Sequence, residues 1–123
     1  MHIQESGEMY LEAIYVLLKK MGNVRAIDIS QHLGYSKPSI SRAMGILKSG
    51  GYIEIDELSH IHLTDAGRSV AEKIYERHDI LSQMLISLGV PAETATKDAC
   101  RLEHAISDES FAAIKAHFSH FNK

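Results

Sequence analysis

The sequence predicts a mainly α-helical protein with one short β-hairpin near its middle. Two observations lead to this prediction. Apolar side chains recur every three or four residues over most of the chain, as they do on a helix with one buried face. Around residues 52–63 that period gives way to strict alternation, in "YIEID" and "HIHL", which is typical of half-buried strands.

The first two predicted helices are separated by a glycine-containing break. Residues 6–21 form an amphipathic pattern that ends at Gly22-Asn23. Its apolar stripe consists of Tyr10, Ala13, Ile14, Leu17 and Met21. A short helix is expected over residues 26–33, and Gly34-Tyr35 then make a tight turn.

Ser36 is suited to the N-cap of a third helix, which would run to Ser49 with Pro38 in its first turn. Its core-facing residues are expected to be Ile40, Met44 and Leu47, with Ala43 beside them. The two alternating segments that follow are joined by the short loop 57–59, so they are expected to pair as a hairpin.

Three more helices are expected to complete the chain. Thr64 would cap a long helix to about residue 88, and Pro91 would start another to about residue 106. Ser107 would cap the last helix, whose first turn carries the acids Asp108 and Glu109 at its positive end.

The order of helix, helix, turn, helix and hairpin is that of a winged helix-turn-helix. We therefore expect a winged helix-turn-helix DNA-binding domain over residues 1–63 and a second, helical domain over residues 64–123. A small helical core with an incidental hairpin is the alternative for residues 24–63. The charge distribution favours the first interpretation: residues 19–48 carry a net charge of +5, while the remaining 93 residues carry −8.

In a helix-turn-helix the second helix lies in the major groove of double-stranded DNA. Arg42 on this helix can donate two hydrogen bonds to a guanine edge. The basic segment and the start of the helix supply the other candidate DNA-binding residues, which are Arg25, Ser36, Lys37, Pro38 and Ser39. The hairpin is acidic, at Glu54, Asp56 and Glu57, so we expect it to contact DNA little.

The stretch "DACRLEHAISDE", residues 98–109, places the only cysteine, Cys100, three residues before Glu103 and four before His104. On a helix these spacings put a thiol, a carboxylate and an imidazole on one face, and all three side-chain types bind transition metals. Elsewhere, His78 interrupts an apolar seam on the fourth helix, and Met9 and Glu12 share one face of the first. Taken singly, each of these last three would be an ordinary packing or surface residue.

Together these residues resemble a known family. "EMYLEAIYVL" (8–17), "ISQHLGYSKPSISRAM" (29–44), "LTDAG" (63–67), "YERHDIL" (75–81) and "DACRLEHAISDE" are similar to the diphtheria toxin repressor and manganese transport repressor family, which are metal-activated bacterial DNA-binding dimers. The resemblance covers nearly the whole chain. It implies a transcriptional repressor of metal homeostasis that binds a palindromic operator as a homodimer, with an activating metal between a DNA-binding lobe and a dimerisation lobe.

The resemblance implies the metal ligands Met9, Glu12, His78, Cys100, Glu103 and His104. Methionine and cysteine at the positions of Met9 and Cys100 are features of the iron type, whereas Glu12 matches a ligand of the manganese type. Thiolate and thioether are soft donors, so we expect Fe(II) to be favoured, Mn(II) next, and Zn(II), Co(II) or Ni(II) to bind in vitro. A closed tetrahedral zinc site made by Cys100, His104, His78 and one carboxylate is the competing interpretation.

The chain departs from the iron type at Ser82 and Thr96, where that type carries a carboxylate and a histidine of an ancillary metal site. This argues against a separate site of that kind. The chain also ends just after its last predicted helix, so it is expected to be the short form without an SH3-like domain.

Other function classes fit the sequence less well. No apolar run approaches the roughly 18 residues of a membrane span, and the N-terminus does not resemble a signal peptide, so we expect a cytoplasmic protein without a membrane partner. No oxyanion donor or Gly-rich phosphate loop accompanies Cys100, so we expect neither an enzyme nor a small-molecule substrate. A metal-independent winged-helix regulator with Cys100 as a redox switch remains the alternative. The dimer surface is expected among Ile74, Leu81, Leu85, Leu88, Phe111, Ile114 and Phe118.

Overall fold

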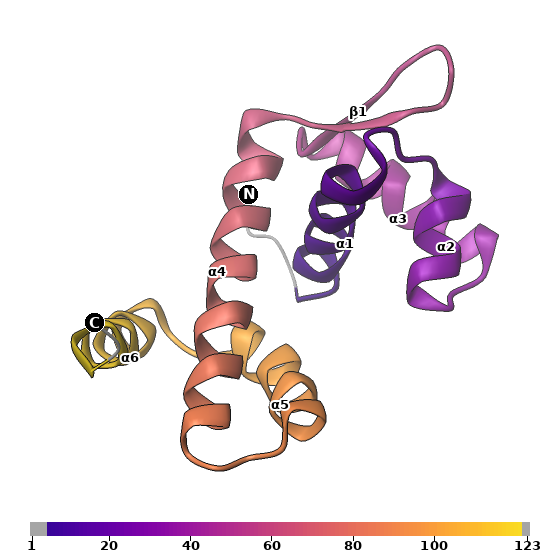
Figure 1. Cartoon of the computed structure of the whole chain (residues 1–123). Helices are drawn as coiled ribbons and strands as arrows, with labels where there is room; N and C mark the ends of the chain where they lie inside the picture. Colours follow the sequence, from indigo (N-terminus) through magenta and orange to yellow (C-terminus); the bar gives the residue numbers. More distant parts are fainter. Residues whose placement is uncertain (1–4, 122–123) are drawn as a thin grey trace. The chain divides into compact units, whose positions relative to one another are not determined.

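A computed structural model describes residues 5–121 of the chain, which divide into two compact units (Figure 1). The first unit extends to Glu72 and the second begins at Lys73. The boundary by compactness therefore falls inside a helix, α4 (Asp65–Ser87). The expected functional boundary between residues 63 and 64 remains a prediction.

The expected order of elements is confirmed. The first unit contains α1 (Glu5–Met21), α2 (Ala26–Leu33), α3 (Lys37–Ser49), β1 (Ile53–Ile55), β2 (Ile61–Leu63) and the start of α4. The second contains the rest of α4, α5 (Ala92–Ala105) and α6 (Asp108–Phe121). In the part of the chain that the structure describes, no helix combines the length and the apolar character needed to cross a membrane.

The first unit is a winged helix-turn-helix built on one apolar core. The strands β1 and β2 are antiparallel, with Ile53 opposite Leu63 and Ile55 opposite Ile61. The helix α3 turns Ile40, Met44 and Leu47 into the core, as its spacing predicts. The other fully buried or nearly buried members include Leu11, Ile14, Val24, Ile29, Ile53, Ile61 and Ala71.

Three predicted N-caps are confirmed by hydrogen bonds. The Ser36 hydroxyl accepts from the Ser39 backbone N–H at 3.3 Å, at the start of α3. Thr64 Oγ1 accepts from the Gly67 N–H at 3.1 Å, and Ser107 Oγ accepts from the Ser110 N–H at 3.1 Å. Each cap satisfies a backbone donor that has no partner inside its own helix.

The expected apolar stripe of α1 is correct except at its end. Met21 is 51% exposed, whereas Leu11, outside the predicted stripe, is fully buried. Met21 is the last residue of α1, and Gly22 then takes a left-handed conformation with φ of 82° that redirects the chain. The stripe therefore stops one turn before the helix does.

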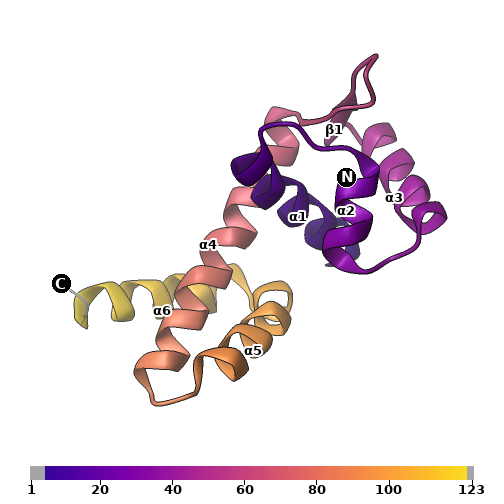
Figure 2. The same cartoon turned by 45° about the vertical axis from the view of Figure 1, so that its right-hand side comes forward.

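The second unit is a three-helix assembly around a small core. In Figure 1, α5 and α6 lie on either side of the later half of α4, and Figure 2 shows α6 crossing it. Leu81 of α4, Ala99 of α5 and Phe111 of α6 form the buried centre, and Met84 and Ile114 pack against it.

The expected dimer surface needs a correction. Ile74, Leu81 and Phe111 are each at most 7% exposed within a single chain, so they cannot provide free surface for a second copy. Leu88 is 73% exposed, and Leu85, Ile114 and Phe118 are partly exposed, so these members of the expected set can still offer such surface. The error arose because an apolar seam does not reveal whether a neighbouring helix of the same chain already covers it.

We expect Gly67→Ala to destabilise the protein. A Cβ atom at Gly67 would lie 2.0 Å from the Tyr52 carbonyl oxygen, which is backbone and cannot rotate away. Overpacking of this kind costs about 1–3 kcal/mol or more. The free energy of unfolding from urea titration would measure the loss.

Gly45→Ala is the matched control, because Gly45 lies within α3 and, apart from its chain neighbours and the backbone of its own helix, no described atom comes within 4 Å of its added Cβ. This change should stabilise the protein by about 0.8–1 kcal/mol through helix propensity. Equal effects of the two substitutions would contradict the close approach at Gly67.

Candidate metal centre and nucleic-acid interface

The candidate metal centre of the second unit is built around a buried carboxylate. Glu103, near the end of α5, is 1% exposed. Its Oε2 lies 2.9 Å from Nδ1 of His78 on α4, and its Oε1 lies 3.4 Å from Nε2 of His104. The carboxylate therefore stands between two imidazoles, one from each of two helices.

Cys100 adds a sulfur atom to this cluster. Its Sγ lies 3.7 Å from Nδ1 of His78, and one ligand atom from each of His78, Cys100 and Glu103 lies within 4.8 Å of the others. Donors at about 2.1 Å from a tetrahedral metal stand about 3.4 Å apart. The spacing of these side chains is thus close to that of a ligand set before a metal draws it together.

The donor set fits a borderline transition metal. It offers imidazole nitrogen, carboxylate oxygen and a thiol that binds as thiolate, which suits iron, cobalt, nickel or zinc better than magnesium or calcium. Glu103 is the buried anchor, while Cys100 is exposed and His78 is partly buried. The arrangement can therefore admit an ion from the side of the thiol.

The sequence spacing predicts this grouping well. Cys100, Glu103 and His104 come together because residues three and four apart share a helix face. His78 lies in the same cluster because this polar residue, on an otherwise apolar face of α4, points toward α5.

Met9 and Glu12 belong to the first unit. Both lie on α1, three residues apart, and both are partly buried. The Tyr35 hydroxyl donates to Met9 Sδ at 3.8 Å, and the Tyr35 ring meets Tyr10 edge-on with centroids 6.2 Å apart. Sequence reasoning missed this role of Tyr35, since residues 26 positions apart carry no local signal of contact.

The candidate DNA-reading surface lies at the start of α3. Lys37, Pro38 and Arg42 are exposed and Ser39 is partly so. Ser36 is already engaged: its hydroxyl caps the helix and donates to Ser39 Oγ at 3.0 Å. Arg25 is exposed just before α2, and its backbone N–H donates to the Asp28 carboxylate at 2.9 Å.

The hairpin is organised by one carboxylate. Asp56 Oδ1 accepts from the backbone N–H groups of Leu58 and His60, each at 2.9 Å, while Oδ2 lies 2.8 Å from His62 Nε2. The hydrogen bond to His62, then that to His60, lowers the pKa of Asp56 from 3.8 to about 2. The acidic charge of the hairpin is thus partly offset by its own histidines whenever they are protonated.

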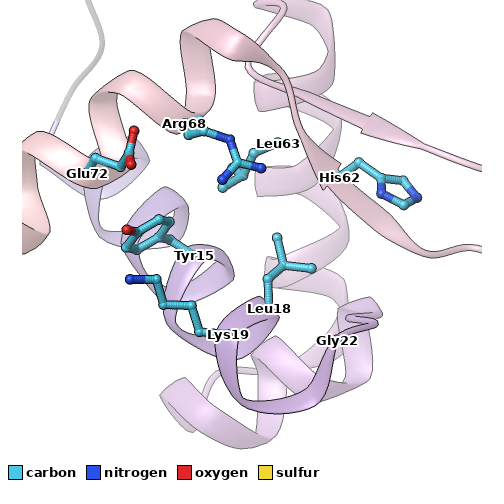
Figure 3. A pocket seen from close by; sticks show the side chains of 8 residues that line it. All are labelled: Tyr15, Leu18, Lys19, Gly22, His62, Leu63, Arg68 and Glu72. Atoms are coloured by element: carbon cyan, nitrogen blue, oxygen red, sulfur yellow. The ribbon is translucent and has the colours of Figure 1, made fainter.

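A cavity of about 560 Å³ lies elsewhere in the first unit, between α1, β2 and the start of α4 (Figure 3). Its charged lining residues, Lys19, Arg68 and Glu72, are all exposed. Two cations and one carboxylate around an open hollow do not resemble the buried donor set of the second unit.

Two protein-family models match this chain, one over each half. Residues 2–61 match the family model described as "Iron dependent repressor, N-terminal DNA binding domain". Residues 64–123 match the one described as "Iron dependent repressor, metal binding and dimerisation domain".

Individual relatives agree with these matches. The chain is 33% identical to the transcriptional regulator MntR of Escherichia coli O6:H1, covering 93% of this chain and 74% of the relative. It is 28% identical to the iron-dependent repressor IdeR of Mycobacterium bovis, covering 85% of this chain and 46% of the relative. A manganese-dependent transcriptional repressor solved with manganese superposes with a TM-score of 0.84 at 27% identity, covering 92% of this chain and 52% of that one. The chain therefore spans about half the length of that solved structure.

We expect the low pKa of Asp56 to depend on His62. In an NMR titration of the Asp56 carboxyl carbon, the midpoint should lie near 2, and His62→Ala should move it toward 3.8. Because the folded-state pKa is depressed, the stability that this carboxylate contributes is fully present above pH 3.8 and is lost as the pH falls through about 2. A midpoint unaffected by His62→Ala would show that the backbone hydrogen bonds alone hold the carboxylate.

Proposed function

The chain belongs to the family of iron-dependent repressors, and from this premise we propose that it represses transcription by binding operator DNA in a metal-dependent way, in control of metal-ion homeostasis. The observation that supports the proposal best is the cluster of His78, Cys100 and Glu103. It lies in the segment that matches a metal-binding domain, and its anchor carboxylate is buried.

We propose that the full ligand set is Met9, Glu12, His78, Cys100, Glu103 and His104. We take the DNA-binding domain as residues 1–63 and the second domain as residues 64–123. Met9 and Glu12 come from α1 of the DNA-binding domain, and the other four ligands come from the second domain. A bound divalent cation supplies the positive charge that lets Glu12 and Glu103 act together in spite of their repulsion. Metal occupancy would then bias the orientation of the DNA-binding domain.

Contacts inside the first unit support a link from α1 to the recognition helix. Tyr35 bonds to Met9 through its hydroxyl, and its carbonyl oxygen accepts from Ser30 Oγ at 2.5 Å. Tyr35 directly precedes Ser36, the N-cap of α3. A change at Met9 therefore acts on the residue next to the start of the DNA-reading helix.

We propose Fe(II) as the favoured metal and Mn(II) as the next. The soft sulfur donors of Met9 and Cys100 favour iron over manganese, whereas Glu12 is a hard donor that keeps Mn(II) competent. One relative is named an iron-dependent repressor and one solved structure a manganese-dependent repressor, so both metals are compatible with this proposal. Metal supply in the cell contributes to the choice as much as affinity does.

We propose that the operator is palindromic and is bound by a homodimer in the cytoplasm. A symmetric dimer presents two α3 helices to major grooves one helical turn apart, or a multiple of that. The exposed apolar residues Ile86, Leu88 and Leu102 of the second unit are available for such an interface.

One observation favours a second candidate function. Cys100 is an exposed thiol, so it could be oxidised in a regulator that does not sense metal. Such a regulator would bind operator equally well with chelator and with metal, and would respond to peroxide instead.

We expect Arg42 and Lys37 to affect DNA binding differently. Arg42→Ala should cost about 1–3 kcal/mol on operator DNA and relax preference at one base pair per half-site. Lys37→Ala should weaken operator and random DNA alike and reduce the salt slope of binding by about one. Fluorescence anisotropy at several salt concentrations would measure both. Equal losses of Arg42→Ala on operator and random DNA would rule out base reading by this residue.

We expect operator affinity to rise with metal and to depend on Glu103. Operator binding would be measured anaerobically with Fe(II), Mn(II), Zn(II) and chelator in parallel. Metal should strengthen the binding by about 1–3 kcal/mol. Fe(II) should act at a lower concentration than Mn(II). Glu103→Gln keeps the size of the side chain but removes its charge, so it should abolish activation by metal.

Glu109→Gln is the matched control, because Glu109 is an exposed acid in the first turn of α6, outside the cluster. It should respond to metal as the wild type does. Wild-type activation in Glu103→Gln, or operator binding that is insensitive to chelator in the wild type, would refute the metal-dependent function.

A further inference from the structure

Arg77 is an unusually buried cation beside the candidate metal centre. It precedes His78 on α4 and is only 5% exposed. A charged side chain removed from water is costly unless other groups make most of its hydrogen bonds. Both terminal nitrogens of Arg77 have partners, whereas its buried Nε has none among the described residues. The contacts of Arg77 therefore indicate what the side chain is for.

Most of those contacts are with the end of α5 and the start of α6. One terminal nitrogen donates to the backbone carbonyl oxygens of Glu103, at 3.2 Å, and Ile106, at 2.6 Å. The other donates to the Asp108 carboxylate, and the guanidinium carbon stands 5.4 Å from the centre of the Phe111 ring.

The carbonyl groups that Arg77 binds belong to a helix terminus. The last carbonyl oxygens of a helix have no partner within the helix, and a cation near them is stabilised by the helix dipole. The last turn of α5 carries the side chains of Glu103 and His104. Arg77 thus holds the backbone of the turn from which two proposed metal ligands project.

We propose that Arg77 is a positioning residue of the metal site, which fixes the last turn of α5 against α4 so that Glu103 and His104 meet His78. This proposal rests on the proposed function, since it assumes that the cluster binds metal. Arg77 and His78 are adjacent on α4, so the residue that anchors the turn and the ligand that faces it move together. No metal contact by Arg77 itself is involved.

The shape of the guanidinium is what the role requires. Its planar fork reaches two carbonyl oxygens and one carboxylate at fixed angles, whereas the ammonium of lysine is a single point of charge. Lys73 also binds the Asp108 carboxylate that Arg77 contacts, with its Nζ 2.8 Å from Asp108 Oδ1. Lys73, and after it Arg77, hold the pKa of Asp108 below its usual value, so this partner stays ionised at neutral pH.

The test is a Co(II) titration of the full chain, with the absorption bands of the bound ion as a report on ligand geometry and thiolate contact. Arg77→Lys keeps the charge and loses the fork. We expect it to bind Co(II) about 10–100-fold more weakly than the wild type, with shifted bands. Asp108→Asn, at an exposed position, should lower the affinity less but in the same direction.

Lys115→Met is the matched control. Lys115 on α6 pairs with Glu76 on α4 at 2.9 Å, so its loss removes an ion pair between the same two helices without touching the end of α5. It should leave Co(II) affinity and spectrum unchanged. All measurements would be made well below the melting temperature of each variant, so that a loss of stability alone does not alter them.

Wild-type affinity and spectrum in Arg77→Lys would overturn the proposal, even if that variant melts at a lower temperature. Should Arg77→Lys not fold, Asp108→Asn decides: weakened binding supports the proposal and unchanged binding overturns it. A wild-type protein that binds no Co(II) would instead overturn the metal site itself, and this proposal with it.

Discussion

The second unit depends on a carboxylate that has almost no access to water. Glu103 is 1% exposed, and a buried charge is costly unless other groups compensate it. His78 and His104 lie close to the two carboxylate oxygens of Glu103, and Arg77 donates to the backbone carbonyl oxygen of the same residue. The packing of α4 against α5 therefore fixes the carboxylate and its partners at the same time, which explains why one short helix turn concentrates so much polar chemistry.

What the sequence predicts well is local. The caps at Ser36, Thr64 and Ser107 and the switch from helical to alternating periodicity each arise within a few residues, and the structure confirms them. The grouping of Cys100, Glu103 and His104 is equally local, because a helix face follows directly from spacing.

What the sequence could not show depends on contacts between distant segments. Nothing near Arg77 in the chain reveals the carbonyl groups of Glu103 and Ile106, which it binds 26 and 29 residues later. The contact between Tyr35 and Met9 is hidden for the same reason. Ile74 and Phe111 were expected to face a second copy, yet the chain buries them itself. Periodicity identifies an apolar face but not its neighbour.

The hydrogen bond between His78 and Glu103 bears on how such a site would sense metal. At 2.9 Å, Nδ1 of His78 and Oε2 of Glu103 form a hydrogen bond when one of the two atoms carries a proton. That proton must leave before Nδ1 of His78 donates to a metal, so metal and proton compete for the same position. Cys100 must likewise lose its proton to bind as thiolate. A cluster already satisfied by its own hydrogen bonds binds metal less tightly than an unsatisfied one would. This weakening suits a sensor, since a site that never released its ion could not report a change in supply.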